Sequence, residues 1–412
     1  MTVNSPDFKK DIVNLVSNYL DTDDVQEFSQ HFLMDDSLKK NGLSYISESD
    51  KSQLDYILAP SKDRFQIDRT ITLASKKLRK ENYINLLTNL SELCVTHGML
   101  NLASEIIVKI KKENKVKAVY ANSQLILADI LARKGKWGKS LQTIRSAKKV
   151  FSDENNNHGL AKCSNMIGTI YGEKGNLAKA KVYFEESLTL AQKENDKKLV
   201  AMLEVNLGIV NNIYENYDEA LNYFNEALRK LEELGDLRRI AEVRHNIGMM
   251  FKEQKYYHSA LQQFDSAISI AIRNEYNPIL AISYISKAEI LVNLEEFSFA
   301  AAIADKAKEV AHMLDDKVTI AEVYRLQGII YKSMESYKLS ENCFMSALRI
   351  NKKLEIGLNI AECYYELALL YSLLENVDEE KKFLNFSLNY YKAFNATSHI
   401  TEIEAKLNKI SN

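Results

Sequence analysis

Residues 201–240, AMLEVNLGIVNNIYENYDEALNYFNEALRKLEELGDLRRI, hold the pattern on which the rest of the chain is built. Two helical runs in this stretch are separated by Glu215-Asn216 and followed by Gly235-Asp236. The small and aromatic landmarks of the second run, from Tyr217 to Ala227, are spaced by three, four and seven residues, which places them on one helix face. The stretch therefore predicts a hairpin of two helices.

The landmarks recur with a period of 40 residues, and this makes the stretch one copy of a stacked array. The small position of the first run is occupied by Ala128, Gly168, Gly208, Gly248, Ala288, Gly328 and Ala368. The small position of the second run is occupied by Ala103, Ser140, Ala180, Ala220, Ala260, Ala300 and Ser340. Four residues later comes a mostly bulky position: Ile107, Ile144, Phe184, Phe224, Phe264, Ala304, Phe344 and Leu384. With one early copy offset by a 37-residue step, the sequence predicts eight copies, each stabilised by its neighbours.

The first 79 residues do not follow the repeat. Helical spacing predicts one helix after Pro6, a second run over residues 25–33, a short helix before Pro60 and another helix over residues 63–78. Up to Pro60 the acidic residues outnumber lysine by 11 to 5, which argues against a DNA-reading helix-turn-helix. Two interpretations stay open for this region: a bundle that caps the array, or a separate docking or effector module.

Composition points to a helical protein and away from several partner classes. The chain has 412 residues with only 13 Gly and 3 Pro, and its net charge of -2 gives no general attraction to nucleic acid or anionic membrane. Its four cysteines form no CxxC pair and suit reduced thiols. No leader pattern and no apolar run of about 18 residues is present, so we expect a cytoplasmic protein.

The repeat resembles the tetratricopeptide repeat (TPR), in the long variety of about 40 residues whose first helix carries Asn-Leu-Gly, here Asn206-Leu207-Gly208. The resemblance covers about three quarters of the chain and implies an all-α fold. That fold is a right-handed α-solenoid of about eight TPR helix-turn-helix repeats, with an N-terminal helical extension and a C-terminal capping helix. We expect the N-terminal cap or docking module over residues 1–79, the TPR superhelix over 80–394 and the capping helix over 395–412.

The family resemblance also implies a concave groove formed by successive first helices. Asn206 and Asn246 fall on this wall, and a carboxamide can both donate to and accept from a peptide backbone. In similar proteins this asparagine contacts bound peptides; the alternative is that both asparagines only bond to neighbouring helices. The candidate groove residues are Lys162, Asn165, Asn206, His245, Asn246, Lys252 and Arg325. The lysine clamp of chaperone-binding relatives is matched at one of three positions, by Lys162, so binding of chaperone tails is not expected.

The sequence contains no pattern typical of catalysis or of a cofactor. The seven histidines are dispersed without the spacing of a zinc helix, and no phosphate-cradling loop or nucleophile elbow occurs. We therefore expect a non-enzymatic protein with no cofactor and no metal site.

Two functions remain open. The first is a protein- or peptide-binding scaffold or adaptor that holds a partner segment in the groove. The second resembles bacterial peptide-pheromone receptors, in which a TPR sensor binds a peptide and an N-terminal helical module acts on a response regulator or the transcription machinery. Either way we expect a protein or peptide partner, with no nucleic acid and no membrane, and a homodimer is possible.

Overall fold

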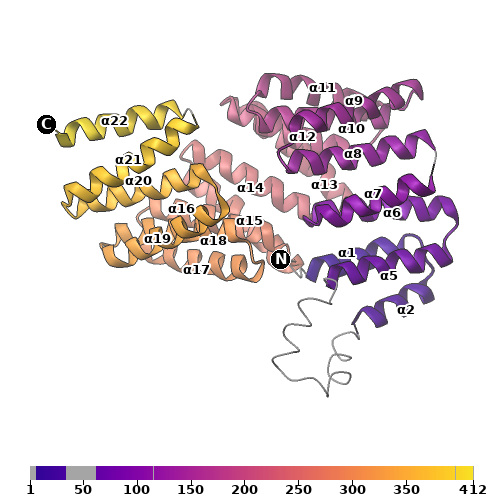
Figure 1. Ribbon diagram of the computed structural model, residues 1–412, viewed down its shortest axis with the longest axis horizontal. Helices are drawn as coiled ribbons and strands as arrows, with labels where there is room; N and C mark the ends of the chain where they lie inside the picture. Colours follow the sequence, from indigo (N-terminus) through magenta and orange to yellow (C-terminus); the bar gives the residue numbers. More distant parts are fainter. Residues whose placement is uncertain (1–5, 34–61, 115, 395, 412) are drawn as a thin grey trace, which may run out of the picture. The chain divides into compact units, whose positions relative to one another are not determined.

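The computed structural model describes residues 6–33, 62–114, 116–394 and 396–411, and every element in these ranges is a helix (Figure 1). The all-α prediction is therefore confirmed. The short helix expected before Pro60 lies outside the described residues. The chain divides into two compact units, Met1–Leu234 and Gly235–Asn412.

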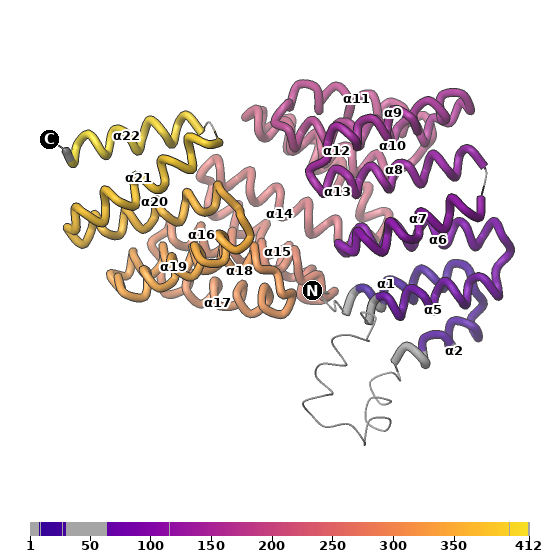
Figure 2. The backbone as a smooth tube through the Cα atoms, in the orientation of Figure 1, coloured from indigo at the N-terminus to yellow at the C-terminus, as the bar shows by residue number. Residues whose placement is uncertain are grey.

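The first unit begins with three helices that precede the repeats: α1 (Pro6–Ser17), α2 (Thr22–Leu33) and α5 (Lys62–Lys77). Four helical hairpins follow, and the Cα trace shows each second helix returning along its first (Figure 2). They are α6 (Lys80–Thr96) with α7 (Leu100–Glu113), α8 (Lys117–Arg133) with α9 (Trp137–Asp153), α10 (Asn157–Glu173) with α11 (Leu177–Lys193), and α12 (Lys197–Ile213) with α13 (Tyr217–Leu234).

The second unit holds four more hairpins and a final single helix. The hairpins are α14 (Leu237–Glu253) with α15 (Tyr257–Asn274), α16 (Asn277–Asn293) with α17 (Phe297–Met313), α18 (Lys317–Ser333) with α19 (Tyr337–Leu354), and α20 (Gly357–Leu373) with α21 (Val377–Ala393). The chain then forms α22 (Thr397–Ser411), which packs on α21. The eight predicted copies are thus eight hairpins of the described chain.

A glycine on the first helix and a phenylalanine on the second bring the two helices of a hairpin together. A Cβ atom added to Gly208 would lie 2.6 Å from Cε1 of Phe224, and one added to Gly248 would lie 2.6 Å from Cε1 of Phe264. Both rings are at most 1% exposed. The ring therefore lies against the bare Cα of the glycine, where no side chain fits.

The turns between helices place one residue in the left-handed region and then cap the next helix. Asn195 has φ 54° and Gly235 has φ 66°, and the carboxylates of Asp196 and Asp236 each accept a hydrogen bond from a backbone N–H of the following helix. Gly357 is the first residue of α20. Its Cα lies against the ring of Phe394, because an added Cβ would meet Cζ at 2.5 Å.

The ends of the array are covered by the helices outside it. Phe8 and Ile12 of α1, Phe28 of α2 and Ile67 of α5 share one buried cluster with residues of α6 and α7. At the other end, Ile403 of α22 is 1% exposed and packs in the cluster formed by α20 and α21. Both contacts bury apolar surface that an unstacked repeat would leave in water.

Two polar residues of first helices pair with the preceding hairpin. Lys287 and Gln327 each contact an aspartate of that hairpin's second helix: Lys287 with Asp265 at 2.5 Å and Gln327 with Asp305 at 2.7 Å. Within the described ranges, no helix has the length and apolar character needed to cross a bilayer.

Candidate partner-binding face

The first helices of the last two hairpins of unit 1, α10 and α12, share a face that the packing of the hairpins leaves accessible. On α12, Asn206, Ile209 and Ile213 lie within about 60° of one another around the helix axis. We call this the α10–α12 face. It is formed by Lys162, Asn165, Met166 and Thr169 of α10 with Met202, Val205, Asn206, Ile209 and Ile213 of α12.

Asn165 and Asn206 form a hydrogen-bonded pair across the α10–α12 face. The Asn206 Nδ2 group donates to Asn165 Oδ1 at 3.0 Å, and both side chains are half-buried. The bond shows that Asn206 does contact the neighbouring helix. It uses one donor and one acceptor, so Asn165 Nδ2 and Asn206 Oδ1 keep their capacity for a further partner.

Exposed isoleucines flank this pair, and they were not among the residues predicted for the groove. Ile209 is 37% exposed and Ile213 is 53% exposed. Their spacing of three and seven residues from Asn206 is the signal that could have identified them. Lys162 is half-buried on α10, and its amine forms no ion pair within the described part of the chain.

In unit 2 the structure separates the neighbours Asn246 and His245. Asn246 is half-exposed on α14, with no hydrogen bond to its side chain from any described residue. His245 is 9% exposed, its Nδ1 lies 3.1 Å from the hydroxyl of Ser283, and its ring packs 5.4 Å from that of Phe264. Burial, with a smaller effect of Lys252, lowers the pKa of His245 to about 4, so the ring is neutral and enclosed.

The two remaining candidate cations of unit 2 are neutralised by neighbouring first helices. Lys252 of α14 pairs with Glu289 of α16. Arg325 of α18 pairs with Glu322 on its own helix and lies 3.6 Å from Glu362 of α20. Despite the opposing effect of burial, these carboxylates hold the pKa of the Arg325 guanidinium above its usual range. Both side chains link one repeat to the next, and a ligand would have to compete with these carboxylates.

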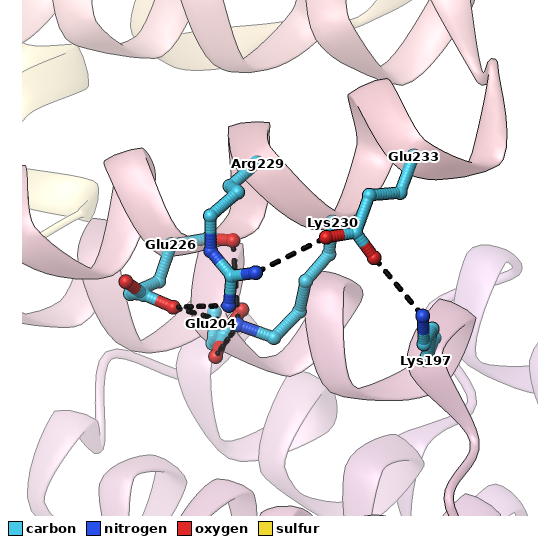
Figure 3. A network of polar contacts seen from close by, with 6 residues as sticks. All are labelled: Lys197, Glu204, Glu226, Arg229, Lys230 and Glu233. Carbon is cyan, nitrogen blue, oxygen red and sulfur yellow. Dashed lines mark hydrogen bonds and ion pairs between the residues drawn. The ribbon is translucent and has the colours of Figure 1, made fainter.

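A separate charged network joins α12 to α13 within the last hairpin of unit 1 (Figure 3). Lys230 lies 2.9 Å from both Glu204 and Glu226, and Arg229 connects Glu226 to Glu233, which also pairs with Lys197. Burial raises the pKa of the Glu204 carboxyl, and Lys230 opposes the rise. The network fastens the hairpin and presents no unpaired charge to a ligand.

Neither cysteines nor metal-binding groups form a site in the described ranges. Cys94, Cys163 and Cys363 are buried, and Cys343 is half-buried. No group of three or more His, Cys, Asp or Glu side chains there is arranged to hold a metal ion.

Both the sequence and the fold of the chain resemble known proteins. Tetratricopeptide-repeat family models match residues 119–193, 199–273 and 321–354. Comparison with curated proteins finds no match.

Among solved structures, the apo form of the quorum sensor NprR from B. thuringiensis is 15% identical, with a TM-score of 0.62 over 80% of this chain and 94% of that one. NprR in complex with its cognate peptide NprX is 14% identical, with a TM-score of 0.53 over 79% and 96%. Aspartyl phosphate phosphatase F from Bacillus subtilis is 13% identical, with a TM-score of 0.56 over 95% of each chain.

At these identities the structural likeness shows a shared fold, and the family models show which repeat builds it. The small, bulky and turn positions that recur every 40 residues coincide with the matched segments. Residues 119–193, 199–273 and 321–354 are therefore tetratricopeptide repeats.

Proposed function

We propose that this chain is a non-enzymatic adaptor that binds a segment of a partner protein or a peptide on the α10–α12 face. The observation that carries the proposal is the Asn165–Asn206 pair, which is half-buried and keeps an unused donor and an unused acceptor. A peptide group offers the complementary acceptor and donor, so the pair can hold a backbone without reading its side chains.

The surroundings of the pair supply the rest of the binding energy. Ile209 and Ile213 expose apolar surface whose burial under a ligand contributes about 25 cal/mol per Å². Lys162, one turn before Asn165 on α10, offers a positive charge with no internal partner among the described residues. The partner segment that suits this face carries apolar side chains beside an acidic one.

The rest of the proposal concerns organisation and setting. Residues 1–79 act as a cap on the first repeat, because α1, α2 and α5 share its buried cluster. Residues 80–394 form the repeat array, and 395–412 close it. We infer a cytoplasmic protein whose partner is a protein or peptide and not nucleic acid, in keeping with the net charge of -2.

Affinity capture with the full-length chain tests the proposal. Partners are identified by mass spectrometry, and a synthetic peptide from the contact region of the leading partner is then titrated. With Asn165→Ala plus Asn206→Ala, affinity for the peptide is expected to fall roughly tenfold, because two hydrogen bonds of about 0.5–1.5 kcal/mol each are lost. Ile209→Asp plus Ile213→Asp is expected to weaken it further by placing charge under apolar side chains.

The matched control is Asn222→Ala plus Asn225→Ala, because these two exposed asparagines of α13 lie on the second helix of the same hairpin. The control is expected to bind as the unmodified chain does. If the control loses as much affinity as Asn165→Ala plus Asn206→Ala, or if neither of these two variants loses affinity, the α10–α12 face is not the binding surface.

A second candidate is a peptide-responsive signalling regulator, in which partner binding changes the N-terminal helices. The similarity to the quorum sensor NprR, solved with its cognate peptide NprX, favours it. The shared cluster of α1, α2 and α5 with the first repeat gives the array a direct contact with those helices. Hydrogen exchange over residues 6–33 separates the two: a change on peptide binding supports the regulator, and unchanged exchange supports the adaptor.

A further inference from the structure

A cavity of about 580 Å³ lies where the end of α5 meets the start of α6 and the end of α7. Figure 2 shows these three helices side by side in unit 1. Its lining residues are Ser75, Leu78, Lys80, Tyr83, Lys109, Lys112 and Glu113. Small-molecule sites in proteins occupy about 300–1,000 Å³, so the volume suits a ligand of that class.

The lining carries an excess of positive charge. Lys80, Lys109 and Lys112 face a single carboxylate, that of Glu113, which leaves two positive charges at neutral pH. None of these lysines forms an ion pair with any described residue, whereas Lys77, close by on α5, pairs with Asp24 at 2.9 Å. The net charge of the chain is -2, so the positive charge of the cavity is a local feature and not a property of the whole chain.

The lining also includes a tyrosine whose side chain is mostly buried. Tyr83 is only 5% exposed, and its hydroxyl makes no hydrogen bond with the described residues. This hydroxyl is therefore available to donate a hydrogen bond to an oxygen acceptor of a ligand.

The start of α6 adds unused backbone donors at the same place. Arg79 stands at the N-cap of α6, and its side chain caps no backbone N–H. The first N–H groups of a helix have no partner within the helix and carry a partial positive charge, which favours an anion. Three amines and a hydroxyl thus line one cavity, and the start of α6 contributes Lys80 to it.

We propose that this cavity binds a small dianion through its phosphoryl or carboxylate oxygens. Lys80, Lys109 and Lys112 supply the charge, Tyr83 donates its hydroxyl, and Glu113 limits the site to ligands with about two negative charges. The site is independent of the α10–α12 face, because it lies on the first hairpin and the helix that precedes it. A bound anion ties α6 to α7, since its ligands come from these two helices, and Ser75 of α5 lines the same cavity.

Titration of the full-length chain with pyrophosphate and with citrate, followed by calorimetry at constant ionic strength, tests the proposal and separates phosphoryl from carboxylate ligands. The unmodified chain is expected to bind at least one of the two. Lys109→Glu plus Lys112→Glu is expected to weaken that binding at least tenfold. Tyr83→Phe, which removes only the hydroxyl oxygen, is expected to weaken it severalfold.

Lys139→Glu plus Lys149→Glu is the matched control, because both lysines are exposed on α9 and the change in net charge is the same. This variant is expected to bind as the unmodified chain does. Circular dichroism without ligand verifies that each variant is folded. Absence of binding by the unmodified chain to both anions overturns the proposal, as does an equal loss of affinity in the two charge-reversal variants.

Discussion

Replacement of Gly208 by alanine tests the contact that sets the distance between the two helices of a repeat. The new Cβ atom would lie 2.6 Å from Cε1 and 2.8 Å from Cδ1 of Phe224. Carbon atoms in contact are normally about 3.5–4.0 Å apart. Because Phe224 is 1% exposed and enclosed in the hairpin, its ring cannot swing into solvent, and the helices must separate.

Two opposing contributions set the change in the free energy of unfolding caused by Gly208→Ala. Overpacking of a core costs about 1–3 kcal/mol, and alanine is favoured over glycine in a helix by about 1 kcal/mol. Because the ring is fully enclosed, we expect the cost near the top of its range and a net loss of roughly 1–2 kcal/mol. Gly172→Ala is the matched control, because its Cβ would lie 3.9 Å from the Cβ of Ala180, an ordinary contact. That variant is expected to gain roughly 0.5–1 kcal/mol.

Urea unfolding followed by far-UV circular dichroism measures both variants, which lie in the same unit. A third variant, Gly208→Ala plus Phe224→Leu, recreates a pair that the chain already uses at Ala368 and Leu384. Its loss is expected to be smaller than the sum of the two single losses, since the smaller side chain makes room for the methyl group. If Gly208→Ala stabilises the chain as Gly172→Ala does, the helix spacing is not set by the ring.

Two predictions concern buried ionisable groups. Lys230→Met removes the cation beside Glu204, whose side chain is 8% exposed, and is expected to cost about 3 kcal/mol at pH 7. Burial already raises the Glu204 pKa, so as pH falls this carboxyl is protonated in the folded chain before it is protonated in the unfolded chain. The loss of stability caused by Lys230→Met should therefore shrink as pH falls toward 4.5, and urea unfolding at pH 7 and pH 5 measures the difference. Burial lowers the pKa of His245 to about 4, against 6.5 in the unfolded chain. The contribution of the neutral ring to the free energy of unfolding is therefore fully present above pH 6.5 and is lost as pH falls to 4, by roughly 3 kcal/mol at most. His245→Gln should remove this dependence, and a pH profile identical to that of the unmodified chain would contradict the assignment.

The repeat could be predicted from sequence because close packing demands the same kind of residue at the same phase of each copy. The sequence also carries a correlation between the small position of the first helix and the bulky position of the second helix, and the prediction did not include it. Each hairpin from α10–α11 onward that has phenylalanine at the bulky position has glycine at the small one, as in Gly328 with Phe344. Hairpins with Ala304 or Leu384 have alanine instead. The ring and the methyl group compete for one volume, which becomes evident once their distance is known.

The candidate face was harder to predict, because the position of a polar residue within the repeat does not show whether its side chain is exposed to solvent or contacts the next repeat. His245 and Asn165 occupy equivalent positions of their repeats, yet His245 is enclosed beside Ser283 while Asn165 is half-exposed. The difference depends on the residue 38 to 41 positions away on the neighbouring first helix. Such a partner is specific to each pair of repeats and leaves no periodic signal.

The two units therefore differ in what their first helices leave for a ligand. In unit 2, Lys252 and Arg325 are paired with carboxylates of neighbouring or the same first helices, and Lys332 lies 2.6 Å from Glu366 of α20. A ligand there must displace ion pairs that already satisfy these groups, so little free energy is gained. On the α10–α12 face, Asn165 keeps its amide donor and Ile213 remains half-exposed. An unused donor and acceptor beside the exposed Ile209 and Ile213, and not the mere presence of polar residues, favour a partner in unit 1.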